Sequence, residues 1–171
     1  MKNVFRFVAA LTLSAVLGAC TAPSSRSTKV SAAIKGANYT NDYINFTLIS
    51  TSGVSLGIGG DASPFSKGGI GGTACCAKLA GVGETIRIEL KIGGFSNSAN
   101  KFRTYIRDVT VVGAMPKNQS QEPHSVLIVR FFQNYEVEAE LLPGDGSLGP
   151  DNLRMDRLFF VGPKVMRHKG E

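Results

Sequence analysis

The sequence predicts a mainly β domain, built as an antiparallel β-sandwich or a partly closed β-barrel. Three observations predict this fold. Apolar residues recur at every second position in several short segments, glycine and proline fall between those segments, and no long segment repeats with the period of about 3.6 residues typical of helices. Such alternation turns one side of each segment toward a core and the other toward solvent, as in antiparallel sheets.

Residues 85–92 and 136–141 show the clearest alternation. In the first segment, four apolar residues alternate with charged ones: Ile86, Ile88, Leu90 and Ile92. In the second, three apolar residues share one side: Val137, Ala139 and Leu141. The opposite side of the second segment carries three carboxylates: Glu136, Glu138 and Glu140. We expect these carboxylates to form a solvated row that faces cations of a neighbouring strand, either Arg87 with Lys91 or Arg103 with Arg107.

Residues 125–132 form a nearly continuous apolar run, which indicates a strand covered on both faces. Residues 133–135 connect this run to the next strand at the length of a hairpin loop. Further strands are predicted at residues 30–37, 44–50, 102–112 and 158–161. Glycine and proline residues between these segments are typical of turns.

A glycine-rich segment, residues 53–72, contains eight glycines in twenty positions and fits neither a strand nor a helix pattern. We expect a long loop, which is either a binding loop or slack between two strands. Because glycine lets a partner approach the main chain closely, the candidate partner-binding residues are Gly57, Gly59, Gly60, Gly68, Gly69, Gly71 and Gly72. Two fragments, beginning at Gly57 and Gly69, fit a loose dinucleotide-binding pattern, but neither joins a strand to a helix as that pattern requires.

Cys75 and Cys76 are adjacent in the sequence. The Cα atoms of adjacent residues lie about 3.8 Å apart across a trans peptide bond, whereas disulfides usually span about 4.4–6.8 Å. Three interpretations stay open: a vicinal disulfide, two thiols packed in the core, or a redox or soft-metal site. A metal site needs further ligands, and neither His124 nor His168 has zinc-type spacing to the pair. We therefore predict no metal and no other cofactor.

No catalytic residues are predicted. The chain lacks the G-x-S-x-G motif of serine hydrolases with the α/β-hydrolase fold. His124 lies in a polar segment beside proline and is expected at the surface. The chain has 19 Lys and Arg residues and 13 acidic residues. Lys2 and Arg6 belong to the N-terminal segment that we expect to be removed as a signal peptide, and without them 17 cations remain, a net charge of +4. These cations are scattered rather than gathered in a stripe, so we expect no nucleic-acid partner and no small-molecule substrate.

The first nineteen residues are typical of a secretory signal peptide. Lys2 and Arg6 flank the start of an apolar run of roughly a dozen residues, shorter than the about 20 that a membrane-spanning helix needs. The sequence Leu17-Gly18-Ala19-Cys20 then resembles the lipobox of bacterial lipoproteins. This resemblance implies cleavage before Cys20 and acylation of that residue, which anchors the chain in a membrane. Thr21 stands where an aspartate commonly marks inner-membrane retention, so we expect the periplasmic side of the outer membrane.

The expected organisation is a signal peptide at residues 1–19, a lipidated tether at residues 20–29 that is rich in Ser and Thr, and one β-rich domain at residues 30–171. Three groups of residues in this domain resemble a known family. They are the run at residues 36–40, the glycine segment that ends in Cys75-Cys76, and Val129-Arg130-Phe131-Phe132 followed by Asn134 and Glu136-Val137.

Over residues 33–142 these groups resemble the proteobacterial lipoproteins of domain-of-unknown-function family 3304. Members tend to carry tryptophans after the cysteine pair, and this chain has none. The resemblance implies a non-catalytic lipoprotein, because the family has no established enzyme activity. Some such lipoproteins resemble immunity proteins of type VI secretion phospholipase effectors, which implies a periplasmic protein partner.

The leading hypothesis is an outer-membrane lipoprotein that binds a protein partner, in the leading case a lipase-type effector whose active site it covers. One alternative is an envelope structural or assembly lipoprotein. The other is a redox or metal-binding protein that uses Cys75 and Cys76.

Overall fold

The computed structural model describes residues 29–50, 53–72, 74–93, 102–118, 124–144 and 148–171. These residues form eight strands: β1 (Lys29–Asn38), β2 (Ile44–Ile49), β3 (Ser55–Ala62), β4 (Ala74–Ala80), β5 (Thr85–Ile92), β6 (Arg103–Gly113), β7 (Ser125–Phe131) and β8 (Val137–Leu142). Three short 3-10 helices accompany them: η1 (Phe65–Lys67), η2 (Gln133–Tyr135) and η3 (Arg157–Phe159). Within the described ranges, no helix is long and apolar enough to cross a membrane.

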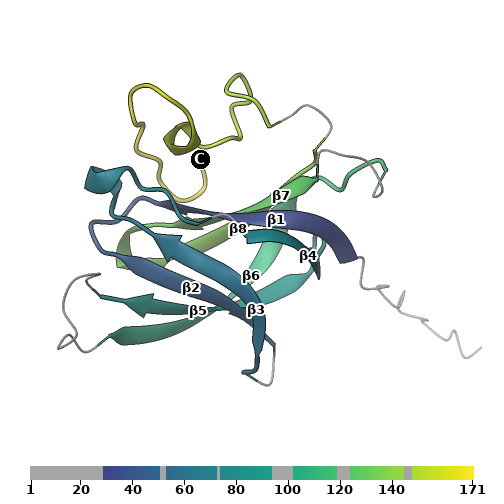
Figure 1. Ribbon diagram of the computed structural model, residues 1–171, viewed down its shortest axis with the longest axis horizontal. Helices are drawn as coiled ribbons and strands as arrows, with labels where there is room; N and C mark the ends of the chain where they lie inside the picture. Colours follow the sequence, from purple (N-terminus) through teal and green to yellow (C-terminus); the bar gives the residue numbers. More distant parts are fainter. Residues whose placement is uncertain (1–28, 51–52, 73, 94–101, 119–123, 145–147) are drawn as a thin grey trace, which may run out of the picture.

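The strands form one curved sheet in the order β3-β2-β5-β6-β8-β7-β1-β4, and this sheet rolls into a nearly closed barrel (Figure 1). Sheet neighbours run antiparallel, except that β1 is parallel to β7 and β6 is parallel to β8. The two edge strands, β3 and β4, contact each other across the remaining gap. The predicted mainly β fold is therefore confirmed, in the form of the partly closed barrel.

The barrel has two ends, which we name by the first and last residues of β1. The Lys29 end also holds the first residues of β3 and β5, because both strands run antiparallel to β2. The Asn38 end holds the last residues of the same strands, Ala62 and Ile92. The side-chain amide of Asn38 donates hydrogen bonds to the main-chain oxygens of Asp42, Ala62 and Ser63, which joins β1 to β3 at this end.

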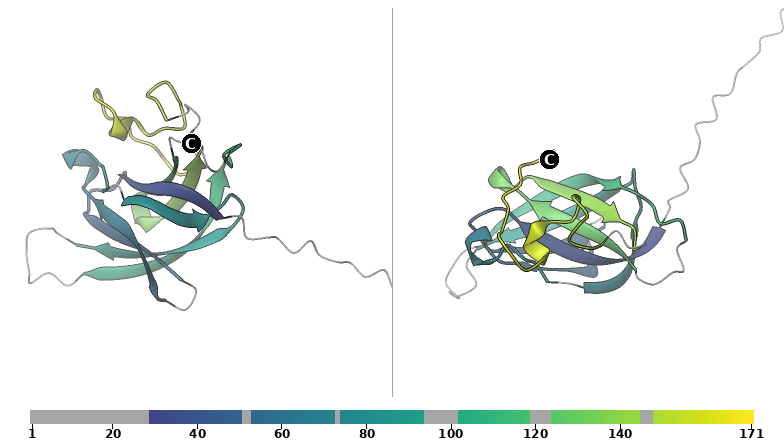
Figure 2. Two further views of the ribbon diagram at one scale, coloured as in Figure 1. Left: turned by 45° about the vertical axis from the view of Figure 1, so that its right-hand side comes forward. Right: turned by 90° about the horizontal axis from the view of Figure 1, so that it is seen from above.

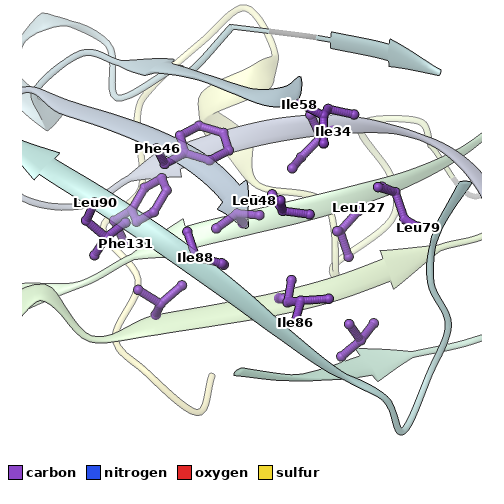
Figure 3. Packing of buried hydrophobic residues seen from close by; sticks show 14 of the residues in the cluster. Ile34, Phe46, Leu48, Ile58, Leu79, Ile86, Ile88, Leu90, Leu127 and Phe131 are labelled. Carbon is purple, nitrogen blue, oxygen red and sulfur yellow. The ribbon is translucent and has the colours of Figure 1, made fainter. Parts of the chain in front are cut away.

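Alternate residues of each strand fill the interior of the barrel (Figure 3). On β5, the predicted alternation over residues 85–92 is confirmed, since Ile86, Ile88, Leu90 and Ile92 are all buried. The rings of Phe46 on β2 and Phe131 on β7 meet across the core with centroids 5.1 Å apart. Burial of each such large apolar side chain contributes about 1.5–3 kcal/mol, so this interior is the main source of stability.

A second apolar cluster lies outside the barrel, between the outer face of β1 and β7 and the C-terminal segment, residues 148–171. That segment, coloured yellow, lies above the strands in Figure 1 and in front of them in the right-hand view of Figure 2. It contributes Met155 and Leu158, which pack with Ile128 and Phe132, and Tyr39 stacks on Phe132 with centroids 5.6 Å apart. All of β7 is buried as a result, which confirms the prediction of a strand covered on both faces.

Several predicted boundaries match the structure within two residues, but three expectations are wrong. Residues 158–161 do not form a strand; their first part belongs to η3, because Leu158 packs onto the outer face of the sheet instead of pairing with it. Residues 55–62 are not loop but β3. Residues 74–80 form β4, which was not predicted because its small side chains hide the alternation. β1 begins at Lys29, one residue before the predicted start of the domain, and the predicted signal peptide and Cys20 lie outside the described residues.

Candidate functional site

The second half of the glycine segment closes the barrel at the Asn38 end. Residues 69–72 lie between β1 and β3, with isolated bridges from Ile70 to Ala37 and from Gly71 to Ala62. On one side, the amide of Gly71 donates to the main-chain oxygen of Gly36 at 2.7 Å; on the other, the amide of Gly72 donates to that of Asp61 at 2.8 Å. We call residues 69–72 the closing segment. The expectation of slack between two strands is therefore wrong for this part of the chain, and its role in binding a partner stays a prediction.

Close approach of main chains explains why glycine is required here. A Cβ atom added to Gly71 would lie 2.8 Å from the Cα atom of Gly36, and one added to Gly59 would lie 2.0 Å from the main-chain oxygen of Phe46. Gly68 and Gly69 have φ angles of 109° and 69°, which side chains disfavour. Of the seven candidate glycines, Gly69 and Gly71 are buried, and only Gly57 and Gly72 are exposed. Gly59, Gly69 and Gly71 have a packing role; the contact of the seven glycines with a partner stays a prediction.

Cys75 and Cys76 lie on the edge strand β4, where a disulfide across a cis peptide bond joins them. Both residues are exposed, so the interpretation as two thiols packed in the core is wrong. Of the three interpretations, the structure agrees with the vicinal disulfide. No group of three or more residues able to hold a metal ion occurs in the part of the chain that the structure describes.

A cavity of about 300 Å³ opens at the Asn38 end of the barrel. Its lining joins residues of β2, β3 and β5 with residues that directly precede β2, follow β5 or precede β6: Tyr43, Ile44, Asn45, Asp61, Lys91, Gly93 and Phe102. The ring of Phe102 lies over Gly93, where an added Cβ would come within 2.7 Å of it, yet 58% of Phe102 stays exposed. Asp61 accepts a hydrogen bond from the Asn45 side chain at 2.8 Å.

The same cavity adjoins the closing segment, because Asp61 of β3 contacts both. Its carboxylate lines the cavity, and its main-chain oxygen accepts the hydrogen bond of Gly72. Lys67 of η1 covers the ring of Tyr43 at 5.4 Å from the centroid, and Ile70 on the closing segment is 43% exposed. We call the cavity, Ile70 and Phe102 the Asn38-end surface. It joins an exposed aromatic residue, an exposed aliphatic residue and charged groups, which is typical of protein-binding surfaces.

A second cavity of about 330 Å³ opens at the Lys29 end, where β3 diverges from β4. Its walls are apolar, formed by Leu48, Leu56, Leu79 and Ile86, while its rim carries Lys29, Lys78, Glu84, Arg87 and Asp108. Arg87 binds Asp108 through two hydrogen bonds, of 2.7 and 2.8 Å. The hydrogen bond from Arg87 lowers the pKa of the Asp108 carboxyl group. The other two cations of the rim, Lys29 and Lys78, have no ion-pair partner among the described residues.

A buried group of charges, which sequence reasoning missed, joins the C-terminal segment to the sheet. Arg130 on β7 donates from Nε to both carboxylate oxygens of Asp156 at 2.9 Å, and from Nη1 to Glu140 on β8 at 2.6 Å. Its Nη2 donates to the main-chain oxygen of Arg154 at 2.7 Å. The hydroxyl group of Tyr39 donates to Asp156. The sequence did offer a signal for this group. Arg130 is the one charged residue in a strand predicted to be buried on both faces, and a buried charge needs a partner of opposite charge.

The environment of this charge group shifts two pKa values upward. Burial raises the pKa of the Tyr39 hydroxyl group, and the negative charge of Asp156 and the hydrogen bond to it raise it further. Burial alone would lower the pKa of Arg130, but its hydrogen bonds and ion pairs with Asp156 and Glu140 raise it overall. Each carboxylate is thus engaged by arginine, which suits a structural role rather than proton transfer.

The prediction of a solvated glutamate row is wrong for Glu140, which is buried and also binds Arg154. The other two glutamates contact the end of the C-terminal segment. Glu136 pairs with Lys169 at 3.2 Å, and Glu138 accepts a hydrogen bond from the amide of Gly170 at 2.7 Å. The partners of the row are therefore distant in sequence, and the predicted pairing with cations of β5 or β6 is wrong. His124 is half-buried and His168 is exposed.

Comparison of the chain with family models, with curated proteins and with solved structures found no match. The resemblance of its motifs to a lipoprotein family stays a prediction. Function is therefore inferred from the chain's own residues, and the Asn38-end surface is the candidate binding site because it joins exposed apolar side chains to a cavity.

Proposed function

We propose that this chain is a lipoprotein of the periplasmic side of the outer membrane, without catalytic activity, that binds a protein partner. The partner is a lipase-type effector of a type VI secretion system, and the chain neutralises it by covering its active site. One observation carries the binding part of the proposal. At the Asn38-end surface, Phe102, which is 58% exposed, lies at a cavity of about 300 Å³.

The position of the lipid anchor supports this choice of surface. The lipobox cysteine, Cys20, precedes the first residue of β1 by only a short segment. A lipid on Cys20 therefore holds the Lys29 end of the barrel near the membrane. The Asn38 end lies at the opposite end of the same strands, where a soluble protein in the periplasm can reach it.

The chemistry of the Asn38-end surface supports a protein partner. Aromatic residues in partly open pockets supply much of the binding energy of protein interfaces, and Phe102 and Tyr43 lie at this cavity. The amides of Gly71 and Gly72 are already bonded to β1 and β3, so the closing segment offers the side chain of Ile70 rather than free main-chain groups. We therefore expect the partner to contact Ile70 and Phe102 rather than the main chain of the glycines.

A toxin-protection assay tests the binding function. Cells that direct a lipase-type effector of a type VI secretion system to their periplasm are expected to survive only when the chain is present. The variant Ile70→Ser/Phe102→Ala is expected to lose protection while remaining folded, as measured by circular dichroism. A matched control is Leu153→Ser, because Leu153 is 94% exposed on the C-terminal segment.

Each outcome of this assay is informative. Full protection by Ile70→Ser/Phe102→Ala would show that the Asn38-end surface is the wrong surface. No protection by the wild-type chain would contradict the immunity function. In that case, a leaky envelope in cells that lack the chain would favour the alternative role in envelope assembly.

Metabolic labelling tests the anchor separately. In cells fed a radioactive fatty acid, the wild-type chain is expected to carry label and to sediment with outer membranes, whereas Cys20→Ala is expected to carry none. A wild-type chain that keeps its leader and carries no label would contradict the lipoprotein assignment.

A further inference from the structure

The Lys29 end of the barrel exposes apolar side chains at the tips of two connections. Val54 and Leu56, beside the connection of β2 to β3, are 63% and 57% exposed, and Val82, between β4 and β5, is 36% exposed. Val54 is held beside the end of β2, because Ser50 donates its amide to the main-chain oxygen of Val54 at 2.8 Å and accepts the amide of Val54 on its side-chain oxygen at 3.1 Å. Exposed apolar residues at one end of a domain are able to enter the boundary between lipid headgroups and acyl chains.

Cations lie beside these apolar tips. Lys29 on β1 and Lys78 on β4 are diagonal neighbours on the outer face of the sheet, since Lys29 pairs with Ala80 and Ser31 pairs with Lys78. Both side chains belong to exposed residues and line the rim of the cavity at this end. Neither has an ion-pair partner in the described ranges of the chain. Two neighbouring unpaired lysines favour an anionic partner.

The acidic groups at the same end do not cancel this charge. Asp108 is engaged by Arg87 at 2.7 Å, and Lys29, Lys78 and Arg87 against Glu84 and Asp108 leave the cavity lining with a net charge of +1. The Lys29 end therefore presents two lysines at the same cavity as exposed Leu56, with exposed Val54 two residues before Leu56 in the chain. Apolar residues surrounded by cations are typical of surfaces that bind anionic bilayers, where the cations contact lipid phosphates.

The length of the preceding chain brings this surface to a bilayer. Nine peptide units separate Cys20 from Lys29, so a lipid on Cys20 keeps Lys29 within about 30 Å of the membrane even when that segment is fully extended. This step rests on the proposed lipoprotein function. We propose that the Lys29 end of the barrel rests on the surface of an anionic bilayer, with Val54 and Leu56 in the headgroup region and Lys29 and Lys78 against lipid phosphates.

Vesicle sedimentation of a chain without lipid tests this contact independently of the anchor. The chain from residue 20 onward, with Cys20→Ser, keeps every described residue and cannot be acylated. It is expected to sediment with vesicles of phosphatidylethanolamine and phosphatidylglycerol, and much less with vesicles of phosphatidylcholine. Lys29→Glu/Lys78→Glu is expected to weaken the binding at least tenfold, and Val54→Ser/Leu56→Ser to weaken it as well. A higher salt concentration is expected to reduce the binding.

Matched controls make the same changes elsewhere. Lys67→Glu/Lys91→Glu alters the charge equally at the Asn38 end, and Val161→Ser/Val165→Ser removes exposed apolar groups from the C-terminal segment; both are expected to bind like the parent chain. Equal loss in the test and control variants would overturn the proposal, as would no binding to anionic vesicles. Equal binding to both kinds of vesicle would also overturn it, and would point to acyl chains entering the cavity without help from the lysines.

A second measurement uses the lipidated full chain in native outer membranes. An environment-sensitive fluorophore on Val54→Cys is expected to shift to the blue, whereas the same fluorophore on Val161→Cys is expected to report water. Equal emission from both positions would contradict bilayer contact. Because the vesicle experiment needs no lipid on Cys20, binding there together with absent fatty-acid label would refute the lipoprotein function but not the bilayer-binding surface.

Discussion

Arg130 and Asp156 form a buried ion pair in which the guanidinium Nε contacts both carboxylate oxygens at 2.9 Å. The two residues come from different layers, because Arg130 belongs to β7 and Asp156 to the C-terminal segment. Both are almost completely buried. This pair, together with Glu140 and Tyr39, fixes the segment that covers the outer face of the sheet, so it predicts how the chain responds to substitution and to pH.

Replacing Arg130 is expected to be strongly destabilising. Arg130→Met leaves Asp156 and Glu140 buried without their main counter-charge, and loss of one partner of a buried ion pair costs about 3–5 kcal/mol. Urea unfolding followed by circular dichroism measures this change. Arg87→Met is the control, because the exposed Arg87–Asp108 pair is expected to contribute little. Equal stability of the two variants would contradict a structural role for the buried pair.

Tyr39 is expected to make stability fall at alkaline pH. Its pKa is raised in the folded chain above the ordinary value of 10.0, so the folded chain holds this proton more tightly than the unfolded chain. The associated stabilisation is fully present below pH 10.0 and is lost as pH rises above it, with a slope of up to about 1.4 kcal/mol per pH unit.

The variant Tyr39→Phe isolates this contribution. It is expected to be less stable than the wild type near neutral pH by about 1.5–3 kcal/mol, since a hydrogen bond to a charged group is lost. Above pH 10 its stability is expected to fall less steeply than that of the wild type. Urea titrations between pH 8 and pH 11 measure both differences, and Tyr105→Phe, at a half-buried residue of β6, serves as the control. Parallel pH profiles of Tyr39→Phe and wild type would refute the assignment.

A methyl group on Gly71 is expected to disturb barrel closure. In Gly71→Ala the new Cβ would meet the Cα atom of Gly36 at 2.8 Å, and overpacking of this kind costs about 1–3 kcal/mol. The neighbouring variant Gly72→Ala is the matched control, because its nearest atom outside the adjacent residues lies at 3.8 Å. Thermal unfolding is expected to show a lower Tm for Gly71→Ala alone; an unchanged Tm would mean that the closing segment is free to move away from β1.

The disulfide between Cys75 and Cys76 is expected to protect both thiols from alkylation. Intact mass measurement after treatment with iodoacetamide is expected to show no added group on β4 before reduction and two after reduction, because both residues are exposed. Alkylation without reduction would indicate free thiols. The variant Cys75→Ser/Cys76→Ser is expected to protect cells in the toxin assay as the wild type does. Loss of protection by this variant, together with metal bound to the wild-type chain, would favour the redox or metal alternative.

Local sequence determined most of the strands. In residues 85–92 the alternation of apolar and charged side chains matches the burial of β5, because a strand turns successive residues to opposite faces. The apolar run at residues 125–132 likewise indicated a strand covered on both faces. The same kind of local pattern in the first twenty residues supports the proposed export and lipidation, without reference to any fold.

Only the tertiary structure decided which distant residues meet. The closing segment looked like a free loop because its glycines have no pattern of their own; their hydrogen bonds go to β1 and β3. Glu140 looked solvated because its partners, Arg130 and Arg154, are supplied by another strand and by the C-terminal segment. Sequence periodicity reports which side of a strand is apolar, but it contains no information about the element that will cover the other side, and this is settled only when the whole chain packs.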